Sequence, residues 1–347
     1  MLINYLPGVV ALLVGLAALP GVKRLARSFN LYDVPGPLKI HGNPIPRLGG
    51  IAMFTGFLCG VALLFLRAET HAILPIVVFA IVWAVGLADD LHPLSAYFRF
   101  AVQLGAGALL WFAGWRLQWF GWPLADLAAT CLFVAFLINA MNLLDGMDGL
   151  AASVAAVACL GFVVLSAESG DALGMTVAGS LFGACAAVLF VNAPPATMFM
   201  GDSGSTLLGV VLAFLSLNWI RSQANPDWLA VPLIVLSVPL ADALLAILRR
   251  VRSHQGMFSG DRRHFYDILS QRGWSTVNIL RLAICVSALL VLCAWSATHG
   301  IIALWIASCA VLCGLAASAV WLGSLQAGSP ALPVSRQETT PIGPAIE

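Results

Sequence analysis

Two adjacent carboxylates, Asp89 and Asp90, stand at the end of a long apolar run with no Lys or Arg beside them in the sequence. Like charges this close repel each other. The pair therefore needs a divalent cation, a basic side chain from another segment, or a raised pKa that makes one carboxyl group a proton acceptor. The structural alternative is a solvated helix end.

A second polar segment repeats at every third residue: Asn139, Asn142, Asp145 and Asp148. On a helix this spacing makes one polar stripe, and two glycines in the segment would let the backbone approach a ligand. Oxygen-bearing side chains between two apolar runs make poor lipid-facing surface. They suit Mg²⁺, which is bound through few carboxylates plus substrate phosphate. The pattern therefore favours a magnesium or phosphate site over a simple polar turn.

A third segment, Gly201-Asp202-Ser203, opens an apolar run after a Pro-Pro break. Asp and Ser at a helix start are good N-caps, which is the structural alternative. The amide-rich N-terminus of a helix also suits a phosphate group. Asp202 beside it could hold a metal ion, so this segment is a candidate for the same site.

Two basic segments accompany the acidic ones. Lys39, His41 and Arg47 lie in a stretch shaped by Pro and Gly, and Arg262 and His264 lie in a loop rich in arginine and aromatic residues. Part of this charge is the ordinary signature of a cytoplasmic loop. Arginines with histidine and aromatic rings also suit a diphosphate and a sugar or base.

The elements that carry these residues must cross a membrane. The chain has 347 residues, of which 61% are hydrophobic and only 10% charged, whereas soluble domains carry about 25% charged residues. Its mean hydropathy is +0.95, and its net charge of +1 gives no reason to expect a nucleic-acid partner. About eleven apolar runs approach the length of a membrane helix. They lie roughly at 2–20, 49–66, 72–88, 99–114, 126–142, 149–167, 172–191, 204–220, 228–248, 278–297 and 300–321.

We therefore expect an all-α, polytopic integral membrane protein with about eleven transmembrane helices. Residues 1–322 should form a single transmembrane catalytic domain, and residues 323–347, rich in Pro, Ser, Gly and Thr, a disordered tail. Of the 17 lysines and arginines, all but Arg67, Arg116 and Arg221 fall in one set of alternating loops. The positive-inside rule places that set in the cytoplasm, with the N-terminus outside and the C-terminus inside.

The acidic residues follow the same division. Those of the polar segments cluster on the predicted cytoplasmic side at the edges of apolar runs, where ionisable groups are costly. On the opposite side, acids such as Asp126 and Asp171 occur singly in short loops. Asp242, at the inner end of the ninth run, is expected to pair with an arginine of the basic loop. This asymmetry predicts that the chemistry takes place at the cytoplasmic face.

Taken together and in order, the polar segments resemble the polyprenyl-phosphate N-acetylhexosamine-1-phosphate transferase family. The resemblance covers about residues 33–274 and rests on the segments 33–50, 89–90, 139–150, 201–203 and 261–264. It implies that the phosphate of undecaprenyl phosphate attacks the β-phosphorus of a UDP-N-acetylhexosamine, giving a polyprenyl-diphospho-sugar and UMP. It also implies a requirement for Mg²⁺, for which Mn²⁺ could substitute, and a place in the bacterial inner membrane at the first membrane step of cell-surface polysaccharide synthesis.

The resemblance also implies roles for individual residues. Asp202 would be the leading metal ligand with Asn142 as the second, and Asp89 and Asp90 would handle the lipid phosphate. The remaining residues would contact the substrates: Asp145 and Asp148 the nucleotide, Arg262 and His264 the diphosphate or sugar, and Lys39, His41, Arg47 and Asn139 other substrate groups. The sequence leaves open which amino sugar is transferred and whether the chain forms a homodimer.

Two other functions compete with this interpretation. A transporter would carry its intramembrane acids near the middle of the bilayer on interrupted helices, whereas these acids lie at one edge. A metal-dependent membrane prenyltransferase would have two similar Asp-rich repeats, and the segments around Asp89 and Asp145 are not similar.

Overall fold

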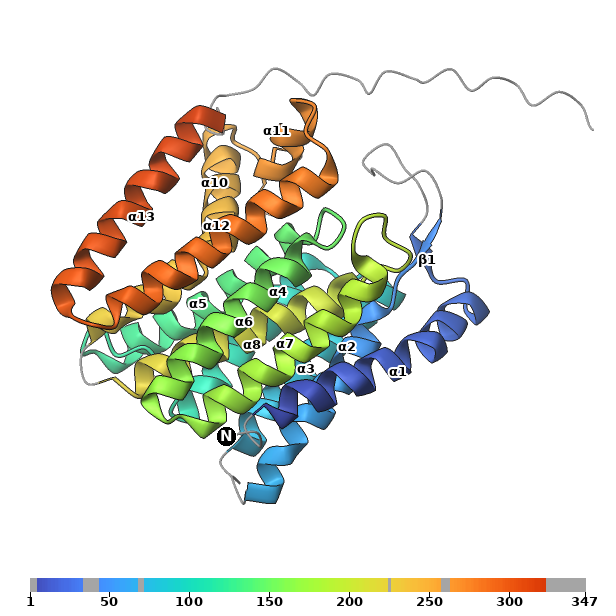
Figure 1. Ribbon diagram of the computed structural model, residues 1–347, viewed down its shortest axis with the longest axis horizontal. Coiled ribbons are helices and arrows are strands. Elements are labelled where there is room, and N and C mark those ends of the chain that lie inside the picture. Colours follow the sequence, from blue (N-terminus) through green and yellow to red (C-terminus); the bar gives the residue numbers. More distant parts are fainter. Residues whose placement is uncertain (1–4, 34–43, 68–71, 224–225, 257–262, 323–347) are drawn as a thin grey trace, which may run out of the picture.

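The computed structural model describes residues 5–33, 44–67, 72–223, 226–256 and 263–322. They form a helical bundle, shown in Figure 1, in which helices from all parts of the chain pack side by side. The α-helices are α1 (Leu6–Ser28), α2 (Gly49–Val61), α3 (Ile73–Leu91), α4 (Ala96–Phe112), α5 (Pro123–Leu144), α6 (Leu150–Ser169), α7 (Ala172–Asn192), α8 (Gly201–Arg221), α9 (Ala230–Val235), α10 (Ser237–Arg252), α11 (Phe265–Gln271), α12 (Thr276–Ala297) and α13 (Ile301–Leu322).

Seven of these helices are long and apolar enough to cross a membrane: α1, α3, α5, α6, α7, α8 and α12. The expectation of an all-α, polytopic membrane protein is thereby confirmed. Each predicted apolar run contains helix, but α2 has only 13 residues and is continued by the 3-10 segment η2 (Ala62–Arg67). The number of about eleven spans therefore stays a prediction.

The ninth apolar run, 228–248, is not one continuous helix. It comprises the 3-10 segment η4 (Pro226–Leu229), the short α9 and then α10, with a break at Leu236. Pro239 has no amide hydrogen to donate to the carbonyl of Val235, and its ring would clash with that carbonyl in a continuous helix. The prediction of a single helix there was wrong because a composition window does not register this local effect.

Helix α8 is the axis of the bundle. In its most apolar 18-residue window, 94% of the residues are buried, compared with 28% for α1 and for α12. It packs against α3 and α5 along its length and also contacts α2, α6 and α7. Because α8 is surrounded, its N-terminus at Gly201 is fixed relative to the ends of its neighbours.

The only strands among the described residues form a small antiparallel pair beside this N-terminus. Strand β1 (Tyr32–Asp33) pairs with β2 (Ile45–Pro46), with Tyr32 opposite Pro46. The chain then continues past the α7–α8 loop, where the amide of Gly49 donates to the carbonyl of Phe199 at 2.9 Å. The segment from β2 to the start of α2 is thereby attached to the residues that lead into α8.

Candidate active site

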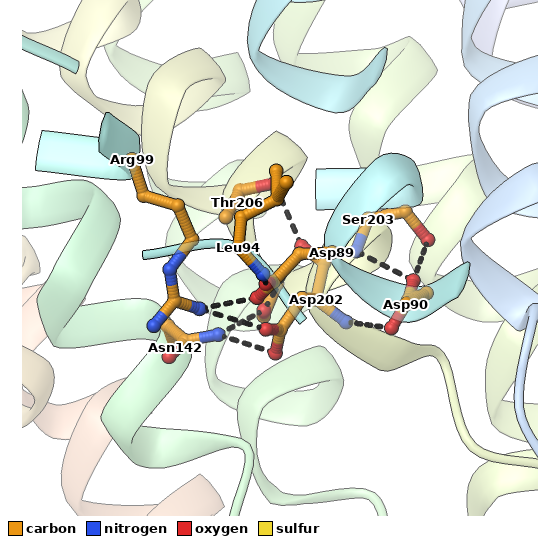
Figure 2. Close-up of polar contacts among 9 residues, drawn as sticks. Asp89, Asp90, Leu94, Arg99, Asn142, Asp202, Ser203 and Thr206 are labelled. Atoms are coloured by element: carbon orange, nitrogen blue, oxygen red, sulfur yellow. Dashed lines mark hydrogen bonds and ion pairs between the residues drawn. The ribbon is translucent and has the colours of Figure 1, made fainter. Parts of the chain in front are cut away.

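The three acidic segments meet at one end of the bundle. The C-terminal ends of α3 and α5 and the N-terminal end of α8 come together there, as Figure 2 shows for their polar side chains. Asp89 and Asp90 belong to α3, Asn142 to α5 and Asp202 to α8. We call this region the acid end.

Asp90, a residue of α3, caps the N-terminus of α8. Its carboxylate accepts hydrogen bonds from the amide of Asp202 at 2.8 Å, the amide of Ser203 at 3.0 Å and the hydroxyl of Ser203 at 2.7 Å. These amides are among those that a helix start leaves without partners, and a negative charge is favourable there. Gly201, which opens α8, has a φ of +73°, and a Cβ on it would lie 2.6 Å from the Asp90 carboxylate. Asp90 therefore fixes where Asp202 stands.

Arg99 joins Asp89 to Asp202. One nitrogen of its guanidinium group, Nη1, donates to Oδ2 of Asp89 and, at 3.0 Å, to Oδ2 of Asp202. The other oxygen of Asp89 accepts from the amide of Leu94 at 2.6 Å. For the adjacent carboxylates, the sequence left open a divalent cation, a basic side chain or a raised pKa. Arg99 is a basic side chain that pairs with Asp89 (Figure 2).

The sequence interpretation counted Arg99 only among the positive charges of a cytoplasmic loop. A local signal was present, because Ser95 caps α4 by accepting from the amide of Phe98 at 3.2 Å. A capped helix start shortly after an acidic helix end makes a tight turn between the two. An arginine in the first turn of the second helix can then reach back to the acids.

Asn142 connects α5 to the same cluster. Its amide nitrogen donates to Oδ1 of Asp202 at 2.8 Å and to the hydroxyl of Ser205 at 2.9 Å. A cavity of about 20 Å³ lies beside these groups, which is room for about one water molecule. Its polar lining comes from Arg99, Gln103, Asn139, Asn142, Asp202 and Thr206. Asn139 is thus part of the site, and its amide donates to Gln103 at 2.5 Å.

The polar stripe on α5 is shorter than the sequence suggests. The helix ends at Leu144, so Asn139 and Asn142 lie on it, whereas Asp145 and Asp148 lie in the turn that follows. A helical stripe through all four residues would need α5 to continue to Asp148, but a turn follows Leu144, and Gly149, with a φ of +71°, already precedes the start of α6.

Asp148 joins two loops rather than pointing freely into the site. Its Oδ2 accepts from the amide of Ala196 in the α7–α8 loop at 2.9 Å. The buried Asn192 makes a second connection, accepting from the amide of Gly149 at 3.1 Å and donating to the carbonyl of Met198 at 3.2 Å. The α5–α6 turn and the α7–α8 loop are thereby held together.

Asp145 stands in a strongly negative surrounding. Withdrawal of its carboxyl group from water, together with the charges of Asp202, Asp90 and Asp148, raises the pKa of Asp145 well above its usual range. In the part of the chain that the structure describes, the charges identified as acting on this carboxyl group are all negative. A cation bound at this point would relieve a repulsion that the described side chains leave in place.

The donor atoms of the acid end fit Mg²⁺. Among the described residues, no group of three or more His, Cys, Asp or Glu side chains could hold a metal ion by itself. Mg²⁺ does not require one, because it keeps several waters and is usually held by one or two carboxylates plus substrate phosphates. Asp202, Asn142 and Asp145 offer the hard oxygen atoms that this ion prefers.

The basic segments are described only in part. Lys39, His41 and Arg262 lie outside the described residues. Arg47 lies beside β2, with its Nη1 3.9 Å from Oδ1 of Asp33. His264, predicted to contact substrate, is only 3% exposed, and its Nδ1 lies 2.6 Å from Oδ2 of Asp242. Asp242 thus pairs with this histidine, because α11 brings His264 directly onto α10. Its pairing with an arginine of the basic loop stays a prediction.

Comparison with known proteins places the chain among members of one enzyme family. The family described as glycosyl transferase family 4 matches residues 72–220. The chain is 32% identical over 278 residues to the probable undecaprenyl-phosphate N-acetylglucosaminyl 1-phosphate transferase of Bacillus subtilis, covering 77% of each chain. It is 32% identical over 310 residues to the decaprenyl-phosphate N-acetylglucosaminephosphotransferase of Mycolicibacterium smegmatis, covering 78% of this chain and 76% of that one.

A more distant relative is the undecaprenyl-phosphate alpha-N-acetylglucosaminyl 1-phosphate transferase of Escherichia coli K12, 26% identical over 296 residues and covering 77% of each chain. The family match spans α3 to α8 and therefore includes the acid end as the structure has it: Asp89, Asp90, Arg99, Asn142 and Asp202. With two relatives above 30% identity over more than three quarters of its length, this chain belongs to glycosyl transferase family 4.

Proposed function

We propose that this protein transfers N-acetylglucosamine 1-phosphate from its UDP derivative to a polyprenyl phosphate, releasing UMP. The observation that carries the proposal is the acid end, where Arg99 bridges two carboxylates beside an asparagine and a small polar cavity. The named relatives act on undecaprenyl or decaprenyl phosphate and on N-acetylglucosamine. A transporter would have no use for this cluster at one end of its helices.

An apolar groove supports the lipid acceptor. It has a volume of about 700 Å³ and lies between α5, α9, α10 and α13, the helix at the edge of the bundle in Figure 1. Its lining is almost wholly apolar, with Phe136, Leu240 and Leu312 as examples. Phe136 lies one helical turn before Asn139 on α5, so one helix borders both the groove and the polar cavity. A prenyl chain in the groove would keep its phosphate near the acid end.

The proposed reaction exchanges one phosphoanhydride bond for another. An oxygen of the lipid phosphate forms a bond to the β-phosphorus of the UDP-sugar. The bond from that phosphorus to the oxygen bridging it to the α-phosphorus breaks, and UMP leaves with that oxygen. Negative charge gathers on the phosphoryl oxygens during such a transfer, so a well-placed cation stabilises the transition state. Arg99 supplies this charge, and Asp89 and Asp202 orient its guanidinium group.

Asp202, Asn142 and Asp145 would hold Mg²⁺, with Mn²⁺ as an alternative. When bound, the ion would neutralise charge on the diphosphate of the donor. Asp90 keeps Asp202 in place through the start of α8. In this proposal, Asp145 and Asp148 would stand on the donor side and Asp89 on the acceptor side.

We also propose that the acid end faces the cytoplasm of a bacterium, with the chain in the inner membrane. The excess of lysine and arginine in the loops on this side supports that orientation. It puts the N-terminus outside, the C-terminus inside and about eleven spans between them. The donor would then be taken from the cytoplasm and the acceptor from the surrounding bilayer.

The test is UMP release by the purified protein in detergent. The assay contains undecaprenyl phosphate and one donor at a time, UDP-N-acetylglucosamine or UDP-N-acetylgalactosamine, with Mg²⁺ or with EDTA. We expect UMP only when lipid and Mg²⁺ are both present, and mainly from the N-acetylglucosamine donor. UMP release without the lipid, or none from either donor by folded protein, would contradict the proposal.

A further inference from the structure

We propose that Tyr266 is a positioning residue for the sugar-nucleotide donor, acting through the turn that carries Asp145. The inference rests on the proposed function, since it assigns Asp145 to the donor side of that reaction. Tyr266 lies on α11, more than a hundred residues after the turn in sequence, and is 5% exposed. It contacts none of Asp89, Arg99 and Asp202 through any hydrogen bond or ion pair that we identify among the described side chains.

The phenol of Tyr266 is in direct contact with the backbone of the α5–α6 turn. Its hydroxyl donates to the carbonyl of Leu143 at 3.1 Å, two residues before Asp145. A Cβ on Gly146 would lie 2.1 Å from the same hydroxyl oxygen, so only glycine fits at that position. The hydroxyl thus contacts the turn on both sides of Asp145. Any change in its position moves the backbone that carries this carboxylate.

Tyr266 is itself held firmly. Its ring stacks on the ring of His264 with centroids 5.4 Å apart and planes 5° from parallel. His264 is fixed in turn by Asp242 of α10, whose second oxygen accepts from the amide of Phe265 at 3.1 Å. Asp267 completes the start of α11 by accepting from the amide of His264 at 3.2 Å. A series of contacts therefore connects α10 to the acid end: Asp242 binds His264, His264 stacks on Tyr266, and Tyr266 binds the α5–α6 turn.

This arrangement predicts a selective effect on the donor. Asp89, Arg99 and Asp202 are held by contacts on α3, α4 and α8 that Tyr266 does not make. Loss of the phenolic hydroxyl should therefore loosen the Asp145 turn while leaving the acceptor side intact. A general structural role would instead lower the activity with both substrates in proportion to the folded fraction.

The first experiment compares Tyr266→Phe with wild type in steady-state kinetics. Loss of one neutral hydrogen bond shifts an equilibrium by roughly 2- to 13-fold. We expect the KM for the UDP-sugar to rise by about that factor, while the KM for undecaprenyl phosphate stays at its wild-type value. The thermal midpoint should fall slightly, because the part-buried carbonyl of Leu143 loses its donor. Tyr5→Phe, at an exposed tyrosine just before α1, is the matched control and should leave both KM values unchanged. Equal rises in both KM values, or none, would overturn the proposal.

The second experiment asks whether the contact itself matters. Gly146→Ala should lower donor turnover further than Tyr266→Phe, because its Cβ collides with the phenolic oxygen. Adding Tyr266→Phe to Gly146→Ala removes that oxygen and should recover part of the loss. Simple addition of the two losses would show that the contact does not position the turn.

These outcomes can be separated from failure of the proposed function. If wild-type protein releases no UMP from any donor, the reaction assignment fails and no variant is informative about it. If wild type is active and the variants behave like wild type, the reaction stands and the role of Tyr266 is overturned.

Discussion

Both ends of the helical bundle contain acidic residues, but the surroundings of these carboxylates differ between the two ends. At the end opposite to the acid end, Asp171 accepts from the amide of Gly174 at 3.0 Å and from the amide group of Asn218 at 2.5 Å. Asp126 accepts from the backbone amides of Trp119 at 3.0 Å and Phe120 at 2.8 Å. Each of these carboxylates stands apart from the other acids and has neutral donors from nearby loops and helices.

At the acid end, by contrast, the acids stand together. Arg99 bridges Asp89 and Asp202, and the charges that raise the pKa of Asp145 come from three neighbouring aspartates among the described residues. Clustering like charges at the edge of a membrane is costly, and the fold would be satisfied by isolated acids of the kind seen at the other end. This difference supports our proposal that the acid end receives a cation and phosphate groups, whereas the carboxylates of the opposite end stabilise the fold.

After loss of the Asp202 carboxylate, the largest effect that this comparison predicts belongs to Arg99. Arg99→Ala should lower kcat/KM by about 10²–10³, because it removes the cation that stabilises the phosphoryl oxygens. Arg99→Lys should recover only part of the activity that Arg99→Ala loses. A lysine offers one point charge, whereas the guanidinium group offers a fixed fork of donors.

The matched control is Arg116→Ala at the other end of the bundle. The Arg116 guanidinium lies over the ring of Trp111, 5.3 Å from its centroid, and we expect activity close to wild type. Steady-state UMP release measures both variants. A comparable loss in the two would mean that the acid end has no special role.

A smaller and mixed effect is expected for Asp90→Asn. The amide replaces one of the two acceptor oxygens that hold the amides of Asp202 and Ser203. Loss of a buried acceptor costs about 1–3 kcal/mol, so the thermal midpoint in detergent should fall. Activity should also fall, by about tenfold or more, because the start of α8 carries Asp202. Lost activity with an unchanged midpoint would instead make Asp90 a group that touches substrate.

The smallest effect on catalysis is expected for Asn218→Ala. Asn218 links Asp171 to the indole nitrogen of the buried Trp115, with the second bond at 3.0 Å. Its loss leaves both groups without this partner and should destabilise the protein by about 1–3 kcal/mol. Activity per folded molecule should stay near wild type, as measured after correction for the folded fraction by size-exclusion chromatography. A selective loss of turnover would show that the opposite end takes part in the reaction.

The sequence predicted the helices well, since hydrophobicity alone determines where a chain can cross a membrane. Asp89 and Asp90 at the end of α3, and Asp202 at the start of α8, were expected and confirmed. The break at Leu236 was missed because the apolar composition continues through it.

The sequence pointed to the acidic residues that the structure brings together, but not to Arg99 or to the contacts between them. Arg99 binds Asp202 across 103 positions in the chain, and no spacing rule covers such a distance. The structural alternative for the start of α8 was capping by its own Asp and Ser, whereas Asp90 of α3 accepts hydrogen bonds from the amides there. The pair of His264 with Asp242 was likewise absent from the sequence pattern. Contacts of this kind follow from the packing of helices and not from the local sequence.

The most direct test of this account compares Asp202→Asn with Asp171→Asn, one carboxylate from each end of the bundle. Each variant is measured for UMP release and for its thermal midpoint in the same detergent. We predict that Asp202→Asn lowers kcat by about 10³ or more while its midpoint stays near wild type. Asp171→Asn should keep its activity and melt at a lower temperature. Wild-type turnover by Asp202→Asn, or a selective loss of turnover in Asp171→Asn, would contradict the assignment of chemistry to the acid end.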